Sequence, residues 1–203
     1  MQEDGVDKQE NYQYINDKKK SRRLSALNIF LTAVIIVLII ALIVFTVVIT
    51  SFQVKGESML PNLKEDNRIV VLKYRYTLEY GDIVVLHSPA LPSAMEVDGK
   101  TAVKRVFGKA GDTIAFDKSA CKWIRNGEYV EEEYFGGEYN DDYLNSFPLE
   151  YPELQGNGLT IPEGHLFVLG DNRCIPGAYS LDSHVYGPIS EDAVIGKVIY
   201  VMD

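Results

Sequence analysis

The apolar run at residues 29–49 constrains this chain most, because it contains no charged residue and consists largely of Ile, Val and Leu. Its roughly 21 residues would form a helix of about 31 Å, which matches a bilayer hydrocarbon core of about 30 Å. The run predicts one transmembrane helix, which we place at residues 24–50. A cleaved secretory signal is the alternative. Such signals have an apolar region of about 7–15 residues and a small-residue cleavage site, and residues 50–54 (TSFQV) do not match one.

Basic residues gather on the N-terminal side of this run. They are Lys18, Lys19, Lys20, Arg22 and Arg23. After the run Lys55 is alone, so the positive-inside rule predicts a cytoplasmic tail at residues 1–23 and an extracytoplasmic domain at residues 51–203. A basic cluster can also bind nucleic acid, but its place against the apolar run favours the topological interpretation. Residues 1–17 are polar and lack periodicity, so we expect them to be disordered.

The part after the apolar run is about 150 residues long, which suits one domain with a sizeable core. This part is acidic, which argues against nucleic acid as a partner. Between Asn126 and Asn172 there is no Lys or Arg. Acidic residues cluster there instead, namely Glu128, Glu131, Glu132, Glu133, Glu138, Asp141 and Asp142. We interpret this cluster as a solvated surface loop.

Short β-branched runs bounded by Gly, Pro or Asp predict strands. They lie at residues 68–73, 82–86, 101–107, 112–116, 165–169 and 194–201. No long segment of helical period follows the apolar run, so we expect a mainly-β domain of antiparallel sheets after one transmembrane helix. Residues 117–160 contain Gly136-Gly137, Pro148 and Pro152, and they read as an inserted hairpin or irregular cap.

Cysteine and histidine usage gives no sign of a metal or cofactor. Cys121 and Cys174 are 53 positions apart, and this spacing leaves open whether they form a disulfide. The three histidines are far apart, and neither His-Glu-x-x-His nor Cys-x-x-Cys spacing occurs. We therefore expect no metal and no cofactor.

Ser58 lies nine positions after the apolar run, in the segment 56–61 (GESMLP), where it would meet substrates at a membrane surface. A serine nucleophile needs a base, and no histidine stands in a triad signature such as Gly-x-Ser-x-Gly. Lys104 is the alternative, because it shares a strand face with Ala102 and Val106, and apolar burial lowers the pKa of a lysine. A strand lysine whose amine reaches solvent is the competing interpretation.

Four segments in this order resemble those of bacterial type I signal peptidases (leader peptidases), in the single-span form of Gram-positive bacteria. They are 56–61 (GESMLP), 81–85 (GDIVV), 103–108 (VKRVFG) with Gly111-Asp112, and 170–173 (GDNR) with 180–183 (SLDS). The resemblance runs from the apolar run to the C-terminus and is interrupted at residues 117–160. It implies a Ser-Lys dyad, with Ser58 as nucleophile and Lys104 as general base, then general acid.

The same resemblance implies roles for several further residues. Ser180 would hydrogen-bond Lys104 and orient it, and the Ser58 N–H would hold the oxyanion. The residues that would shape shallow apolar subsites for small side chains are Phe52, Val54, Leu63 and Val103. Asp182, His184 and Arg105 would support the site.

The chain departs from the family pattern at several positions. Gly56 stands where many relatives add a hydroxyl donor, and Asn62 stands where Thr is common. Six residues, instead of the usual two, separate Arg173 from Ser180. The arginine that pairs with the family aspartate is replaced by His184, next but one to Asp182.

The sequence thus predicts a membrane-anchored serine endopeptidase that removes N-terminal signal peptides after small residues. Its partners would be preproteins and membrane lipids, its extended substrate would pair with strands of the domain, and it would be monomeric. A related Ser-Lys protease with a dedicated substrate and an inactive anchored binding module remain the alternatives.

Overall fold

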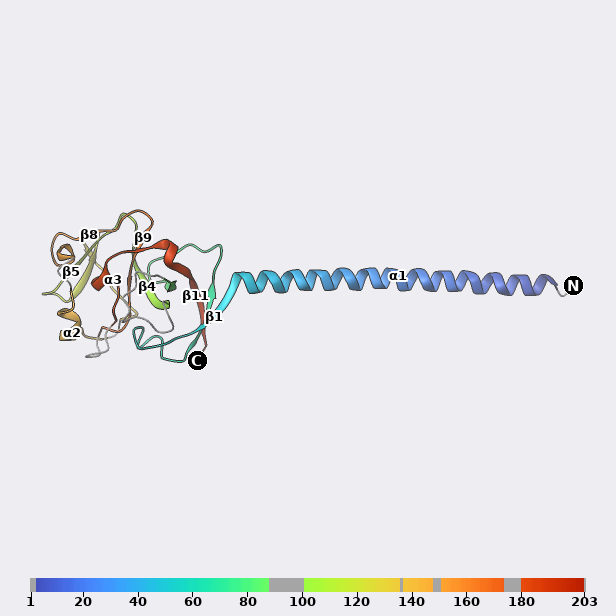
Figure 1. Ribbon diagram of the computed structural model, residues 1–203, viewed down its shortest axis with the longest axis horizontal. Helices are drawn as coiled ribbons and strands as arrows, with labels where there is room; N and C mark the ends of the chain where they lie inside the picture. The colour runs from blue at the N-terminus through green and yellow to red at the C-terminus, as the bar shows by residue number, and fades with distance from the viewer. Residues whose placement is uncertain (1–2, 88–100, 136, 148–150, 174–179, 203) are drawn as a thin grey trace. The chain divides into compact units, whose positions relative to one another are not determined.

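The computed structural model of the protein describes residues 3–87, 101–135, 137–147, 151–173 and 180–202. The first element is the helix α1 (Glu3–Val48), drawn as one continuous helix in Figure 1. Within it, Lys18–Val48 has a window of mean hydropathy 3.3, so this stretch is long and apolar enough to cross a membrane. The expectation of disorder at residues 1–17 is wrong from Glu3 onward, because extending a helix costs much less than nucleating one.

The chain divides into two compact units, Met1–Val47 and Val48–Asp203. The second unit is built on a seven-stranded sheet in the order β1-β2-β11-β3-β4-β9-β10, in which all neighbours pair antiparallel. Its strands are β1 (Ile49–Gln53), β2 (Arg68–Leu72), β3 (Ile83–His87), β4 (Thr101–Lys109), β9 (His165–Leu169), β10 (Ile189–Ser190) and β11 (Val194–Met202). The mainly-β antiparallel expectation is confirmed.

A second, four-stranded antiparallel sheet has the order β7-β6-β5-β8. Its strands are β5 (Thr113–Asp117), β6 (Lys122–Arg125), β7 (Glu128–Tyr129) and β8 (Leu159–Thr160). Most of this sheet comes from residues 117–160, so that segment is less irregular than predicted. The hairpin part of the expectation is met by β6 and β7, which are joined through Asn126 and Gly127, both at positive φ.

Short helical turns complete the second unit. They are α2 (Asp141–Leu144), η2 (Pro152–Gln155), α3 (Ser183–Tyr186) and η3 (Glu191–Ala193). Three of the turns begin at side-chain caps. Asn140 accepts from the Tyr143 N–H, Asp182 from the His184 N–H and Ser190 from the Asp192 N–H. In Figure 1, β4 and β9 lie between the side that carries β5 and β8 and the side that carries β1 and β11.

Strand β4 contributes to three hydrophobic clusters. Val103 packs against the cluster around Val54 and Leu63, whereas Val106 belongs to a cluster in the middle of the large sheet. A register shift against β9 between Val106 and Gly108 displaces Phe107, which packs with Trp123 of the second sheet. Because β4 is held by both sheets, the central residues of this strand have little freedom to move.

Candidate active site

Ser58 lies in a turn between β1 and β2 that backbone hydrogen bonds hold in place. The Leu60 N–H donates to the Glu57 carbonyl at 3.1 Å, and the Ser58 carbonyl accepts from the Asn172 N–H at 3.0 Å. The Asn172 side chain also donates to the Glu57 carbonyl, at 3.1 Å. The loop that follows β9 therefore holds the main chain on both sides of the Ser58 amide, while Ser58 itself stays partly exposed.

Gly56, at the start of this turn, has a φ of +76°. This left-handed conformation favours glycine over any residue with a side chain. The backbone geometry thus gives a physical reason for the absence of the hydroxyl that many relatives carry two positions before the serine.

Lys104 is in the middle of β4 and is 1% exposed. Burial lowers the pKa of its amine to about 8, although Asp182 and Asp171 act in the opposite direction. The amine is therefore much easier to deprotonate than that of a surface lysine. In the register of β4 with β9, Arg105 opposes Leu169, so Lys104 lies across from Gly170.

Gly170 is the point at which the chain segments of the site meet. A Cβ atom added to Gly170 would lie 2.0 Å from Ser180 Oγ and 2.5 Å from the Ser58 carbonyl oxygen. Only glycine permits this approach. The structure therefore brings the main chain of Ser58 and the side chain of Ser180 together at Gly170, which lies across from Lys104 in the register of the sheet, although these residues are far apart in the sequence.

Ser180 does not form the hydrogen bond to Lys104 that the resemblance implies. Its hydroxyl is buried and has no hydrogen-bond partner among the residues that the structure describes. Instead the hydroxyl packs against the backbone of Gly170, while the Ser180 N–H donates to the Asn172 carbonyl at 2.8 Å. The residues before it, 174–179, lie outside the described part of the chain.

Asp182 and His184 form a buried pair in which the His184 Nδ1 lies 2.5 Å from the Asp182 Oδ1. The other Asp182 oxygen accepts from the Gly170 N–H at 2.7 Å. Burial raises the pKa of Asp182, but His184, Lys104 and the Gly170 N–H together outweigh burial and hold the pKa below its ordinary value. Asp182 is therefore a carboxylate at neutral pH.

Arg105 points away from Lys104 and forms a two-pronged ion pair with Asp171, at 2.8 and 2.5 Å. Asn62, four residues after Ser58, donates to the same Asp171 carboxylate at 2.9 Å and to the Tyr134 carbonyl at 2.8 Å. The Arg105 guanidinium also lies over the Tyr134 ring, 4.1 Å from its centroid. Sequence reasoning missed the roles of Asn62 and Tyr134 because neither has a recognisable motif.

The interpretation of the acidic cluster as a solvated surface loop is wrong for one of its members, Glu132. Its side chain is 6% exposed and pairs with the fully buried Arg173 at 2.6 Å, and a second bond between them measures 2.8 Å. Arg173 also donates to the Gly170 carbonyl at 3.0 Å. The ion pair joins the segment after β7 to the loop that carries the site, and the other acids of the cluster are exposed.

The four predicted subsite residues all belong to one hydrophobic cluster. Val54 and Leu63 are fully buried, whereas Phe52 and Val103 keep exposed surface. Phe52 and Val103 are therefore the two of this set that can contact a substrate directly, while Val54 and Leu63 support them from below.

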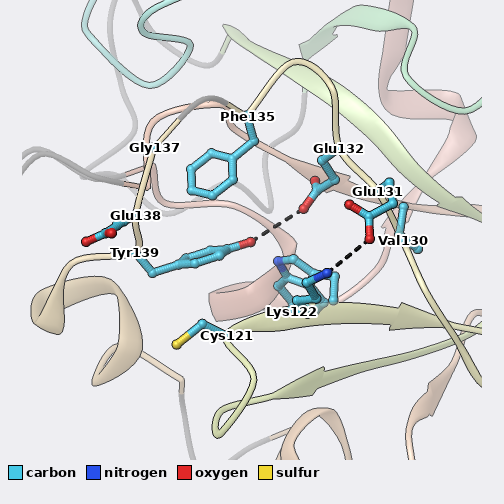
Figure 2. Close-up of a pocket in the computed structure, with 10 residues that line it drawn as sticks. Cys121, Lys122, Val130, Glu131, Glu132, Phe135, Gly137, Glu138 and Tyr139 are labelled. Atoms are coloured by element: carbon cyan, nitrogen blue, oxygen red, sulfur yellow. Dashed lines mark hydrogen bonds and ion pairs between the residues drawn. The ribbon is translucent and has the colours of Figure 1, made fainter.

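A pocket of about 490 Å³ lies in the second sheet and does not include Ser58, Lys104 or Ser180. Figure 2 shows Phe135 and Tyr139 on one side of this pocket and the Lys122–Glu131 ion pair on the other. Cys121 at its edge is a free thiol, and Cys174 lies outside the described residues. In the described part of the chain, no three His, Cys, Asp or Glu side chains are grouped to hold a metal.

Comparison with known proteins assigns the chain to a family. Residues 27–202 match the family described as "Signal peptidase, peptidase S26". "Signal peptidase IB" of Staphylococcus aureus is 32% identical over 181 residues, which are 84% of this chain and 86% of that protein. "Probable signal peptidase I-1" of Synechocystis sp. is 31% identical over 169 residues, which are 81% of this chain and 76% of that protein. A crystal structure of a signal peptidase I from Enterococcus faecalis V583 is 29% identical, with a TM-score of 0.44, and the match covers 62% of this chain and 98% of that one.

The family match and the two sequence relatives identify the protein as a serine endopeptidase. The chain belongs to the signal peptidase family, peptidase S26. Membership of this family supports the cleavage of signal peptides as its activity.

Proposed function

We propose that this chain is a membrane-anchored signal peptidase that uses Ser58 as nucleophile and Lys104 as base to remove N-terminal signal peptides from exported preproteins. The observation that carries the proposal is the fully buried Lys104, whose pKa lies at about 8, across the sheet from Gly170 and hence beside the Ser58 turn. An amine with such a pKa has a substantial uncharged fraction near neutral pH, which a general base requires.

The reaction follows from these groups. Ser58 Oγ attacks the carbonyl carbon of the scissile bond while its proton passes to the uncharged Lys104 amine. The carbonyl oxygen becomes an oxyanion, for which the Ser58 N–H is the proposed donor. No described residue accepts a hydrogen bond from this N–H. Lys104 then protonates the departing amine, and a water molecule, deprotonated by Lys104, releases the signal peptide from the serine ester.

The substrate class follows from the subsites and the apolar helix. Phe52 and Val103 keep only part of their surface exposed over a filled hydrophobic cluster, so a substrate side chain placed against them would have little depth to enter, which suits small side chains. The helix Lys18–Val48 would hold the enzyme in the same membrane as its substrates. The basic residues before it favour a cytoplasmic N-terminus and an extracytoplasmic catalytic domain.

Cleavage by point variants tests the proposal. The detergent-solubilised chain is incubated with a panel of preproteins, and cut sites are read by mass spectrometry. Ser58→Ala and Lys104→Ala should each reduce cleavage at least 1,000-fold, as expected for members of a catalytic unit. Ser119→Ala and Lys118→Ala, two exposed positions in the turn after β5, are the matched controls and should cleave at the wild-type rate.

The panel also separates the remaining alternatives. Cuts after small residues in many preproteins support a general signal peptidase, whereas cuts in one substrate alone would indicate a dedicated protease. A wild-type chain that cuts nothing, or a Ser58→Ala variant that cuts at full rate, would reject the proposed mechanism.

A further inference from the structure

His184, Asp182 and Ser146 form a hydrogen-bonded chain beside the proposed base. The His184 Nδ1 contacts the Asp182 carboxylate at 2.5 Å, and the His184 Nε2 contacts Ser146 Oγ at 2.7 Å. The side chains of His184 and Asp182 are both 0% exposed. Ser146 comes from the turn after α2, so this chain of bonds connects the inserted segment to the catalytic loop.

The proton on the Ser146 hydroxyl decides which atom donates to which. Ser146 Oγ lies 2.6 Å from the Tyr143 carbonyl oxygen, and a carbonyl oxygen can only accept. The single hydroxyl proton is therefore used in this bond. The 2.7 Å contact between Ser146 and His184 then requires a proton on the His184 Nε2, because two lone pairs would otherwise face each other.

The other ring nitrogen of His184 carries a proton as well. Its contact with Asp182 needs one proton between the two atoms, which belongs to the nitrogen if Asp182 is a carboxylate. The Gly170 N–H at 2.7 Å and the His184 N–H at 3.2 Å both donate to this carboxyl group and favour its charged form. With protons on Nδ1 and Nε2, the ring is an imidazolium.

The surroundings of the ring favour a cation. The ring of Tyr143 lies 4.4 Å from the His184 ring and that of Phe147 lies 5.3 Å away, measured between centroids. Aromatic faces attract cations, and the effect is larger when water is excluded. The Asp182 carboxylate is joined to this ring by an ion pair, which also favours the charged form.

The charged groups that interact with the neighbours of the His184 ring carry opposite charges, which largely cancel. Lys104 on β4 interacts with Asp182 from the side of the active site, and Asp182 also interacts with Tyr186 on α3. On the other side of the ring, Tyr143 interacts with Arg173 and Glu132, which neutralise each other in their own ion pair.

We infer that His184 is a buried imidazolium that neutralises Asp182, and that it thereby acts as a positioning residue which keeps Lys104 able to work as an uncharged base. The inference deepens the proposed function and rests on it. Ser146 is not a candidate nucleophile, because its proton is bonded to the Tyr143 carbonyl and the neighbouring His184 is inaccessible to a substrate.

The electrostatic effect has a definite sign. The Asp182 carboxylate favours the charged form of Lys104. A cation on His184 cancels most of this attraction, so Lys104 loses its proton at lower pH. Without the cation, Lys104 should hold its proton more tightly, by about 1 pH unit for a nearby unbalanced carboxylate.

Two substitutions at His184 separate charge from packing. His184→Asn keeps an N–H donor towards Asp182 but removes the charge, whereas His184→Arg keeps a permanent charge. We expect the limb of kcat/KM that rises with pH to move about 1 unit upward in His184→Asn and to stay within a few tenths of a unit of wild type in His184→Arg. Ser146→Ala should shift the limb in the same direction as His184→Asn while cleavage still depends on Ser58.

An equal limb position in wild type and His184→Asn, with both proteins folded by circular dichroism, would overturn the positioning role. So would equal shifts in His184→Asn and His184→Arg, since this result indicates packing alone. Loss of all cleavage in Ser146→Ala, in a folded protein, would assign Ser146 a direct role and also reject the inference.

The protonation state can be measured without activity. Nitrogen-15 NMR of the histidine-labelled full chain in detergent, with signals assigned through His184→Asn, should show protons on both ring nitrogens of His184 at pH 7. An unprotonated ring nitrogen at that pH would overturn the inference. Because this measurement needs no cleavage, it remains decisive even if the proposed peptidase activity fails its own test.

Discussion

At the scale of single residues, the site depends on a lysine that the fold holds away from water. Lys104 is buried in β4, and burial is the largest influence on its pKa, which falls to about 8. Gly170 permits the close approach of Ser58 and Ser180 that a side chain would prevent. Both features favour catalysis by Ser58 and Lys104, but they lower the free energy of unfolding of the domain.

The first prediction at this scale concerns the pH dependence of cleavage. Only the uncharged amine of Lys104 accepts a proton from Ser58, so kcat/KM for a signal-peptide substrate should rise tenfold per pH unit below about 8 and level off above it. Stopped-time assays from pH 6 to pH 10 measure the curve. A limb centred near 10.4, where an exposed lysine titrates, would show that burial does not tune Lys104.

The second prediction concerns stability. The pKa of Lys104 is lower in the folded state than its ordinary 10.5, so the unfolded chain binds more protons between about pH 8 and pH 10.5 and stability rises with pH over this window. Below pH 8 the full cost of burying the amine applies. Lys104→Met should therefore be inactive yet more stable at pH 7, by up to about 3 kcal/mol in urea unfolding. A less stable variant would contradict this interpretation.

At the scale of secondary-structure elements, the segment between β7 and α2 supports the catalytic loop. It carries Glu132, which pairs with the buried Arg173, and Tyr134, whose carbonyl accepts from Asn62. Arg173 in turn bonds the carbonyl of Gly170. The inserted segment therefore contributes to the geometry of the site.

Glu132→Gln tests this support. Removing one charge of a buried pair leaves the other uncompensated, and we expect a loss of about 3 kcal/mol in the free energy of unfolding, together with reduced cleavage. Glu131→Gln is the matched control. Glu131 is the next residue along the chain, and its carboxylate makes an exposed ion pair with Lys122 at 3.0 Å, which should contribute little to stability. Denaturant unfolding of both variants decides the matter, and equal effects would refute a special role for Glu132.

The predicted strands illustrate which elements can be read from local sequence. The six β-branched runs correspond to β2, β3, β4, β5, β9 and β11, and the expected bounds differ from the observed ones by at most two residues. Strands β6, β7 and β8 were not predicted individually, because they are two to four residues long and lie among Gly, Pro and acidic residues. Their pairing with β5 and with each other compensates for weak local preference.

At the scale of the whole molecule, the chain consists of a long helix and a separate compact unit. The unit Val48–Asp203 contains both sheets and all three hydrophobic clusters, so it has the core that independent folding requires. Strand β1 directly follows the helix and pairs with β2 over five residues.

Truncation tests this division. Residues 48–203 should fold and cleave a soluble peptide that carries a cleavage site, but they should process membrane-inserted preproteins more slowly than the full chain. Residues 54–203, which lack β1, should be markedly less stable, because β2 then becomes an edge strand and Phe52 is lost from the cluster around Val54. Thermal melts followed by circular dichroism compare the two fragments, and identical melting temperatures would contradict the role given to β1.

The sequence by itself determined the apolar span, the antiparallel β class, the family and the candidates Ser58 and Lys104, because hydrophobic periodicity and short motifs are local properties of the chain. The tertiary structure alone decided that Lys104 is buried, that Ser180 packs on Gly170 without bonding Lys104, and that Glu132, Ser146 and Asn62 serve the site. The contact of Ser146 with His184 and the ion pair of Glu132 with Arg173 each join residues more than 30 positions apart, which meet only in the folded domain, and no local pattern encodes such contacts.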